Sequence, residues 1–317
     1  MKKPRWPHAI ALLTLPSAAV ATAPYLGAAH WVVDLLACFV VQACIALMAA
    51  TAILAIGRKW TLACATATFA IIAASATVPD WLRKPSASRR SDDSPELRLV
   101  AINLLKSNDA GHSQAIQVIQ EAAADLVWFA EYTPTWQRVL GEALPELPYR
   151  LERLDLGSFG VAMYSRYPFE LKELVPGGHV WSPFGRAVIR TPHGPIGVLG
   201  VHPPPPQLNR ISVSERDRGL AAIPPLLNRL PKRRIVLGDF NATPWNDAFQ
   251  EMRRRSGLGV GSTAWWLPSW PDPLPACLRV PLDHVLVSGD LSVTRAALGP
   301  AFGSDHRPLT ATVRVGG

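Results

Sequence analysis

The chain is poor in cysteine, with four among its 317 residues. Cys38, Cys44 and Cys64 lie in apolar runs near the N-terminus, and Cys277 stands alone in the rest. Neither the paired spacing of a cysteine zinc site nor the set of a disulfide framework is present. These absences exclude a disulfide-stabilised scaffold and leave any chemistry to other residue types.

The C-terminal two thirds lacks the charge excess of a nucleic-acid-binding domain. From residue 96 onward there are 23 basic and 20 acidic residues, a balance of +3 within a formal net charge of +8. The other +5 lies in residues 1–95, where basic residues flank apolar runs as they do beside membranes. The basic character of the chain is therefore weak support for a nucleic-acid partner.

Charged residues are missing from three long stretches, 9–33, 35–57 and 61–79. As a helix, each is about long enough to cross a hydrocarbon core of roughly 30 Å. We expect three transmembrane helices over about 9–29, 32–56 and 60–79. The alternatives are a cleaved signal peptide, which Pro24 directly after the candidate cleavage site 21–23 disfavours, and a buried helical hairpin.

Basic residues predict how these helices sit in the membrane. They occupy positions 2–5 before the first stretch and positions 58–59 between the second and third, which favours a cytoplasmic N-terminus. Four basic residues between 83 and 90 favour the opposite orientation. We expect a multi-pass protein of the cytoplasmic (inner) membrane, with a flexible linker at 80–95 and an extracytoplasmic catalytic domain at 96–317.

Beyond residue 96, short runs rich in Val, Ile and Leu alternate with helical stretches, which is typical of an α/β domain. We expect a helix at 112–124 and strands at 97–102, 125–130, 160–165, 187–190, 196–201, 234–237, 284–287 and 310–315. Polar residues directly follow several of these strands; they are Asn103, Glu131, His202, Asp239 and Asn241. Since strand ends hold reactive groups without burying them in the core, these side chains are expected at one shared rim.

The tetrapeptide Gly238-Asp239-Phe240-Asn241 presents a carboxylate and an amide after an apolar run. By itself it is equally typical of an Asx-type turn. Five further motifs accompany it in order along the chain: LRLVAIN at 97–103, VWFAE at 127–131, VLGVH at 198–202, LDHVLV at 282–287 and SDHRP at 304–308. Together the six resemble the endonuclease/exonuclease/phosphatase superfamily of DNase I-like enzymes.

The resemblance covers residues 96–315 and implies a four-layer αββα sandwich of two packed mixed β-sheets. It also implies a hydrolase of phosphate esters that depends on a divalent metal. By resemblance, Glu131 is the principal metal ligand, and Asn103 and Asp305 assist at the metal directly or through water. Carboxylate and amide oxygens suit hard cations, so the expected cofactor is Mg²⁺ or Mn²⁺.

Five residues match catalytic positions of the superfamily. Asp239 matches the residue that orients or deprotonates the attacking water, and Asn241 the residue that donates to the phosphoryl group. His306 matches the catalytic histidine, whose imidazole Asp283 is placed to orient. His202 stands where the repair nucleases carry tyrosine, and in other branches a histidine there contacts a phosphate oxygen or assists the leaving group. Arg186 is a further candidate for steadying a phosphate, although a salt-bridging arginine is at least as typical.

Three functions follow, with different partners. The apolar N-terminus and the tryptophan-rich segment 265–270 favour a lipid bilayer and a lipid-linked or membrane-proximal phosphate ester. The basic clusters 232–234 and 253–255 favour a nuclease, but Ala130 stands where glutamine is common and Asn103 lacks the Trp-Asn that follows it in many nucleases. A binding protein without activity is disfavoured because every expected catalytic position is filled.

Overall fold

The computed structural model describes residues 10, 12, 14–27, 30–82, 94–179, 181–260, 266–289 and 291–316. Most of the predicted linker, 83–93, lies outside the described residues. The helix before it runs to Leu82, three residues further than the linker prediction allows, and the first strand begins at Glu96. The tryptophan at 265 also lies outside the described residues.

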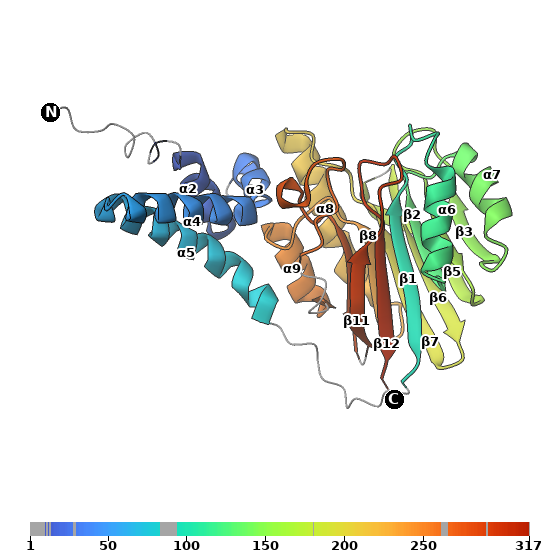
Figure 1. The fold of residues 1–317 in the computed structure, drawn as a ribbon. Helices are drawn as coiled ribbons and strands as arrows, with labels where there is room; N and C mark the ends of the chain where they lie inside the picture. Colours follow the sequence, from blue (N-terminus) through green and yellow to red (C-terminus); the bar gives the residue numbers. More distant parts are fainter. Residues whose placement is uncertain are drawn as a thin grey trace.

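The N-terminal part consists of helices. They are α2 (Leu15–Thr22), the short η1 (Ala23–Tyr25), α3 (Trp31–Ala37), α4 (Val40–Ile56) and α5 (Trp60–Leu82). Helices α4 and α5 pack against each other along their length and α2 packs on both, while α3 contacts α8 of the following domain. Figure 1 shows α3 lying between the other N-terminal helices and that domain.

The expectation of three uninterrupted spans is not supported. Among the described residues, the segment Trp60–Thr77 of α5 is the one helix long and apolar enough to cross a membrane alone, and 28% of it is buried. Helices α3 and α4 pass the same test only as a pair bent by 65°. The described part of the predicted first span holds an eight-residue α2 and the turn at Pro24. The second span is interrupted between Ala37 and Val40, next to the catalytic domain.

Two six-stranded sheets form the centre of the domain that follows. One sheet has the order β11 (Leu291–Leu298), β12 (Leu309–Val315), β1 (Glu96–Asn103), β2 (Leu126–Ala130), β4 (Val161–Ser165) and β3 (Tyr149–Arg153). The other has the order β5 (Phe169–His179), β6 (Ser182–Thr191), β7 (Gly194–Val201), β8 (Arg234–Asp239), β10 (Asp283–Ser288) and β9 (Gly259–Val260). The pairs β1–β2 and β7–β8 are parallel and the other neighbours antiparallel, so both sheets are mixed.

The sheets stack face to face and helices cover their outer faces. One apolar cluster fills the space between the sheets with residues from both. A second joins the first sheet to α6 (His112–Glu121) and α7 (Pro134–Ala143). A third joins the second sheet to α8 (Arg210–Leu227) and α9 (Asp247–Ser256). The two packed mixed sheets and their helices confirm the predicted α/β sandwich (Figure 1).

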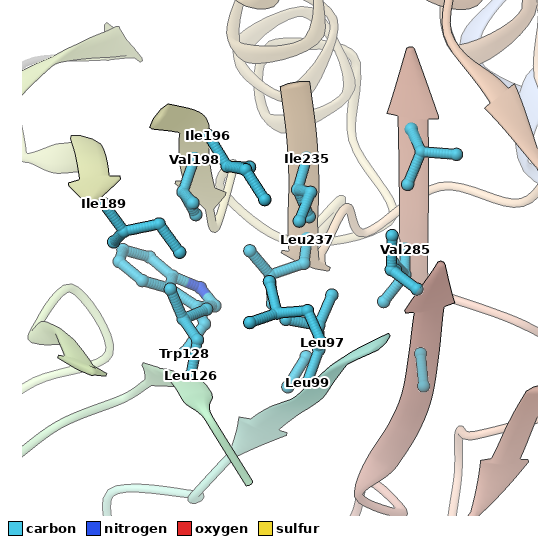
Figure 2. Close-up of a cluster of buried hydrophobic side chains, with 14 of the residues drawn as sticks. Leu97, Leu99, Leu126, Trp128, Ile189, Ile196, Val198, Ile235, Leu237 and Val285 are labelled. Atoms are coloured by element: carbon cyan, nitrogen blue, oxygen red, sulfur yellow. The ribbon is translucent and has the colours of Figure 1, made fainter. Parts of the chain in front are cut away.

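The indole of Trp128 fills the space between the sheets opposite three glycines. Trp128 lies on β2 and is 1% exposed, and Figure 2 shows its ring among the aliphatic side chains of the inter-sheet core. A Cβ on Gly200 would come within 2.1 Å of this ring, and one on Gly185 within 2.5 Å. Gly238, the first residue of the Asp239 motif, has φ +140°, and a Cβ there would lie 2.1 Å from the carbonyl oxygen of Val201. Glycine is therefore required where β8 delivers Asp239.

Candidate active site

The predicted polar residues meet at one edge of the sandwich. Asn103 ends β1, Glu131 follows β2, His202 follows β7 and Asp239 ends β8. Because each of these two strand pairs is parallel, the carboxyl ends of its members point the same way. A cavity of about 310 Å³ is lined by seven of the eight residues expected at the metal or in catalysis: Asn103, Glu131, His202, Asp239, Asn241, Asp305 and His306.

Asp239 lies at the centre of this group. Its Oδ2 accepts a hydrogen bond from Asn103 Nδ2 at 3.1 Å. It also lies 3.5 Å from His306 Nε2 and 3.7 Å from His202 Nε2. The other oxygen, Oδ1, accepts the backbone N–H of Asn241 at 2.8 Å. Asp239 therefore has its orientation fixed from both sheets.

Asp283, the eighth residue, lies behind His306. Its Oδ2 is 2.8 Å from His306 Nδ1, and both side chains are buried. This contact orients the ring so that Nε2 faces Asp239. Burial by itself lowers the pKa of His306, but the carboxylates of Asp239 and Asp283 outweigh it and raise the pKa to about 10. The imidazole is therefore cationic at neutral pH.

The two other ionisable groups at the centre shift differently. Burial raises the pKa of Asp239, with His306 and His202 opposing the shift. Burial also lowers the pKa of His202, although Asp239 pulls it the other way. The shifts therefore favour a proton on His306, a neutral His202 and an Asp239 carboxyl that is more basic than usual.

Two site residues adopt left-handed backbone conformations. Glu131 has φ +56° and Asn241 has φ +49°, a region that glycine favours and that asparagine tolerates better than most residues. The Asn241 side chain donates from Nδ2 to the carbonyl oxygen of Pro203 at 3.0 Å. A glutamate held at positive φ costs of order 1–3 kcal/mol, a strain typical of functional sites.

The residues expected at the metal fit a hard divalent cation. A side-chain oxygen of each of Glu131, Asn103 and Asp305 accepts a hydrogen bond, from Lys106 N, Leu105 N and Trp270 Nε1 respectively. The second carboxylate oxygens of Glu131 and Asp305 have no such bond among the described residues, and all three side chains line the same cavity. An oxygen-only donor set of this kind suits Mg²⁺ or Mn²⁺.

A second group also has the spacing of a metal site. Ligand atoms of Asp239, Asp283 and His306 lie within 4.8 Å of one another and all three residues are buried. Here Asp283 and His306 already form a hydrogen bond at 2.8 Å, and Asp239 lies 3.5 Å from His306, so the three residues are paired without an ion. The oxygen donors at Glu131 and Asp305 are the better cation site.

Arg186 is not brought to the cavity. It lies on β6, 3% exposed, with Nη2 2.7 Å from Glu173 Oε1 and Nη1 donating to the carbonyl oxygen of Leu226. The alternative for this residue, an exposed salt-bridging arginine, is right about the ion pair but not about the exposure. Its side chain ties β6 to β5 and α8.

Other side chains at the site carry no signal in an isolated sequence. Ser304 Oγ donates to the carbonyl oxygen of Asn103 at 2.8 Å and accepts the N–H of His306 at 3.1 Å, so it joins two of the motifs. Its place directly before Asp305 is the only hint of this role. Leu35, Cys38 and Phe39 also line the cavity, although they belong to the apolar N-terminal runs.

Comparisons with known proteins agree on the fold. The Endonuclease/Exonuclease/phosphatase family model matches residues 100–306. An endonuclease/exonuclease/phosphatase from Beutenbergia cavernae is 16% identical, with a TM-score of 0.56 over 70% of this chain and 72% of that chain. D. rerio TDP2 complexed with single strand DNA product is 14% identical, with a TM-score of 0.60 over 69% and 99%. Sphingomyelinase C from Streptomyces griseocarneus is 16% identical, with a TM-score of 0.51 over 69% and 99%. No curated protein sequence matches the chain.

Proposed function

The chain belongs to the endonuclease/exonuclease/phosphatase family, and on that premise we propose that it is a membrane-attached phosphoesterase that hydrolyses a lipid-linked or membrane-proximal phosphate ester. The observation that carries the proposal is the convergence of three elements on Asp239 Oδ2. Asn103 donates to it, and the imidazoles of His202 and His306 lie 3.7 and 3.5 Å away.

The residues have complementary roles in the proposed reaction. Asp239, with its raised pKa, accepts a proton from water as the water oxygen bonds to phosphorus and the ester P–O bond breaks. Cationic His306 donates from Nε2 to a phosphoryl oxygen, where charge develops. Neutral His202 and the amide of Asn241 bind the remaining oxygens. Asp283 holds the His306 ring in place.

A divalent cation held by Glu131, Asn103 and Asp305 would neutralise phosphoryl charge and stabilise the leaving oxygen. The strained backbone of Glu131 is consistent with a carboxylate placed for this purpose. Asn103 would serve both parts of the site, because its Nδ2 donates to Asp239 and its amide oxygen is the atom that would assist at the cation.

Two features support a membrane-proximal substrate. The helices α3 and α4 adjoin the cavity through Leu35, Cys38 and Phe39, and α4 and α5 carry exposed apolar side chains such as Ile45, Ile56 and Ile71. We propose that the α4–α5 hairpin attaches the protein to the cytoplasmic membrane.

Nuclease activity is the second candidate, and the fold similarity to D. rerio TDP2 complexed with single strand DNA product favours it. The predicted basic clusters give it less support. Residues 232–234 lie at the start of β8 and Asp239 at its end, about 17 Å apart at 3.3 Å per residue. Arg254 pairs with Glu251 on α9, and Arg253 is buried. Neither cluster forms a basic track into the cavity.

One experiment tests the proposal. The full-length protein in detergent would be assayed with Mg²⁺, Mn²⁺ or EDTA for phosphate or headgroup release from lipid phosphates, and for nicking of supercoiled plasmid. We expect metal-dependent hydrolysis of the lipid and loss of it in Asp239→Asn and His306→Gln. Efficient nicking with inert lipids would overturn the substrate assignment. Unchanged turnover in both variants would overturn the site.

A further inference from the structure

Residues 34–39 form an elbow between α3 and α4 that belongs to the catalytic site as much as to the membrane helices. The two helix axes meet there at 65°. Leu35, Cys38 and Phe39 of this elbow line the same 310 Å³ cavity as Asp239 and His306. A part of the active-site wall is therefore contributed by the N-terminal helices.

Polar contacts hold the elbow against the catalytic domain. Asp34, 6% exposed, lies 2.7 Å from Nη2 of the fully buried Arg216 on α8. Asn246 donates from Nδ2 to the carbonyl oxygen of Asp34 at 2.8 Å and accepts the thiol of Cys38 at 3.4 Å. Gln42 donates to the carbonyl oxygen of Arg279 at 2.7 Å. These contacts fix which side chains of the elbow face the cavity.

The lining of the cavity is divided by chemistry. The catalytic side chains gather at the strand ends of the two sheets, whereas apolar side chains form the other walls. These are Leu35 and Phe39 of the elbow, Pro205, Pro206 and Leu208 after β7, and Val280 and Leu282 before β10. Phe39 is 41% exposed and Leu208 78% exposed, so both offer apolar surface that the protein itself leaves uncovered.

Resting on the proposed function, we infer that the elbow and the Pro205–Leu208 loop form a subsite for the hydrocarbon chain of the substrate. The phosphate ester would sit at Asp239 and His306, and the chain would leave past Phe39 towards α4. Further along α4, Ile45 and Met48 also expose apolar side chains. Phe39 and Leu208 are then specificity-determining residues for chain length.

Alkyl p-nitrophenyl phosphates provide a matched probe, because the ethyl and decyl esters share a leaving group and differ only in chain length. The full-length protein in maltoside detergent would be assayed for kcat/KM on both. Each buried methylene contributes about fourfold, so we expect the wild type to prefer the decyl ester by at least roughly tenfold. Phe39→Ala and Leu208→Ala are each expected to reduce this preference about tenfold. Partitioning of the decyl ester into micelles is the same for every variant and cancels.

Ile56→Ala is the matched control, since Ile56 is 85% exposed at the far end of α4 and should leave the decyl-to-ethyl ratio as in the wild type. A reduced preference in Phe39→Ala would also follow if the N-terminal helices separated from the catalytic domain. Leu208→Ala excludes that explanation, because Leu208 lies on a loop of the catalytic domain itself. Wild-type activity on both esters with the same ratio in Phe39→Ala and Leu208→Ala would overturn the subsite and leave the phosphoesterase assignment standing.

A binding measurement covers the case in which neither ester is hydrolysed, an outcome that counts against the proposed function. Dissociation constants of ethylphosphonate and decylphosphonate would be measured by calorimetry in the presence of Mg²⁺. Tighter binding of the decyl compound, reduced in Phe39→Ala, supports the subsite. Equal binding of the two by the wild type overturns it whatever the turnover.

Discussion

The Arg216 guanidinium lies 2.7 Å from the Asp34 carboxylate, and the two are 0% and 6% exposed. The pair joins an N-terminal helix to α8 across 182 residues of sequence. Burial raises the pKa of Asp217, which also contacts Arg216, and the guanidinium opposes that shift. The docking of the N-terminal helices on the catalytic domain therefore depends on the pairing of the buried Arg216 guanidinium with Asp34.

Removing one member of this pair should destabilise the protein. We expect Asp34→Ala to cost about 1.5–3 kcal/mol, because the buried guanidinium keeps Asp217 but loses its other carboxylate partner. The double variant Asp34→Leu/Arg216→Met should recover most of that loss. Thermal unfolding of the detergent-solubilised protein measures both. Glu251→Ala, which breaks the exposed pair with Arg254, is the control and should not shift the midpoint. A double variant no better than the single one would contradict the assignment.

The contact between Asp283 and His306 predicts a loss of catalysis without a loss of binding. In Asp283→Asn the ring of His306 loses its ionised partner at 2.8 Å, and an orienting carboxylate is worth on the order of 10²–10⁴ in rate. We expect kcat to fall by that factor and KM to change little. Initial rates across a range of substrate concentrations separate the two. A raised KM with normal kcat would place Asp283 in substrate binding instead.

Glu131 should govern metal affinity. Glu131→Gln keeps the shape of the side chain but removes its charge, so we expect at least about a tenfold rise in the Mg²⁺ concentration that gives half-maximal activity. Calorimetric titration of Mg²⁺ into the metal-free protein gives an independent readout. The control is Glu173→Gln, which removes a carboxylate paired with Arg186 away from the cavity. Equal Mg²⁺ dependence in Glu131→Gln and the wild type would exclude Glu131 as a ligand.

Stability at low pH should depend on Glu152. Burial alone would raise the pKa of Glu152, but hydrogen bonds from Tyr132 and Tyr164, both at 2.7 Å, outweigh it and lower the pKa. A lowered folded pKa contributes stability that is present above the unfolded pKa of about 4.3 and is lost as the pH falls through the folded value. Tyr132→Phe should therefore cost about 1 kcal/mol at pH 7.

The same variant should differ less from the wild type as the pH falls, because protonation of Glu152 removes the charge that strengthens these hydrogen bonds. Denaturant unfolding at pH 7 and pH 3.5 tests this. Tyr149→Phe is the control, because Tyr149 is a 41% exposed tyrosine at the start of β3. A constant difference between Tyr132→Phe and the wild type at both pH values would contradict the role of Glu152.

The fit of Trp128 against glycine can be tested by adding one methyl group. A Cβ on Gly200 would lie 2.1 Å from the indole, and overpacking of a core typically costs 1–3 kcal/mol. We expect Gly200→Ala to lower the unfolding midpoint, and Trp128→Phe in the same chain to restore part of it. Gly259→Ala is the control, since its nearest neighbour would be the carbonyl oxygen of Val287 at 3.7 Å. An unchanged midpoint in Gly200→Ala would contradict the predicted clash.

The sequence predicted the parts of the fold that are buried and locally encoded. All eight expected strands and the helix at 112–124 have counterparts, because continuous Val, Ile and Leu runs mark strands buried on both faces. Strand β5 was missed because alternate residues of Phe169–His179 are exposed and the stretch contains Pro176 and two glycines. Helix α8 was missed because Pro224 and Pro225 lie inside its last turn.

The site was predictable in its motifs and not in its surroundings. Seven expected residues share one cavity because each directly follows or ends a predicted strand, or lies in the Asp305-His306 motif. The prediction that Arg186 binds phosphate is not supported. Arg186 pairs instead with Glu173 of β5, a strand that the sequence analysis did not predict. The elbow escapes prediction for a different reason. Only the folded chain brings Asp34 to Arg216, and with it Phe39 to the cavity.

The position of β12 in its sheet determines when, during synthesis of the chain, the catalytic site can first form. This strand lies between β1 and β11, with Glu96 opposite Arg314, and Asp305 and His306 stand in the loop just before it. Pairing of β12 with β1 closes a loop of more than 200 residues, which is a slow step for a chain made from its N-terminus. A ribosome-bound chain still missing β12 already holds the N-terminal helices and Asp239 but has no completed catalytic centre. Synthesis order alone would keep the proposed hydrolase silent until the whole chain has left the ribosome.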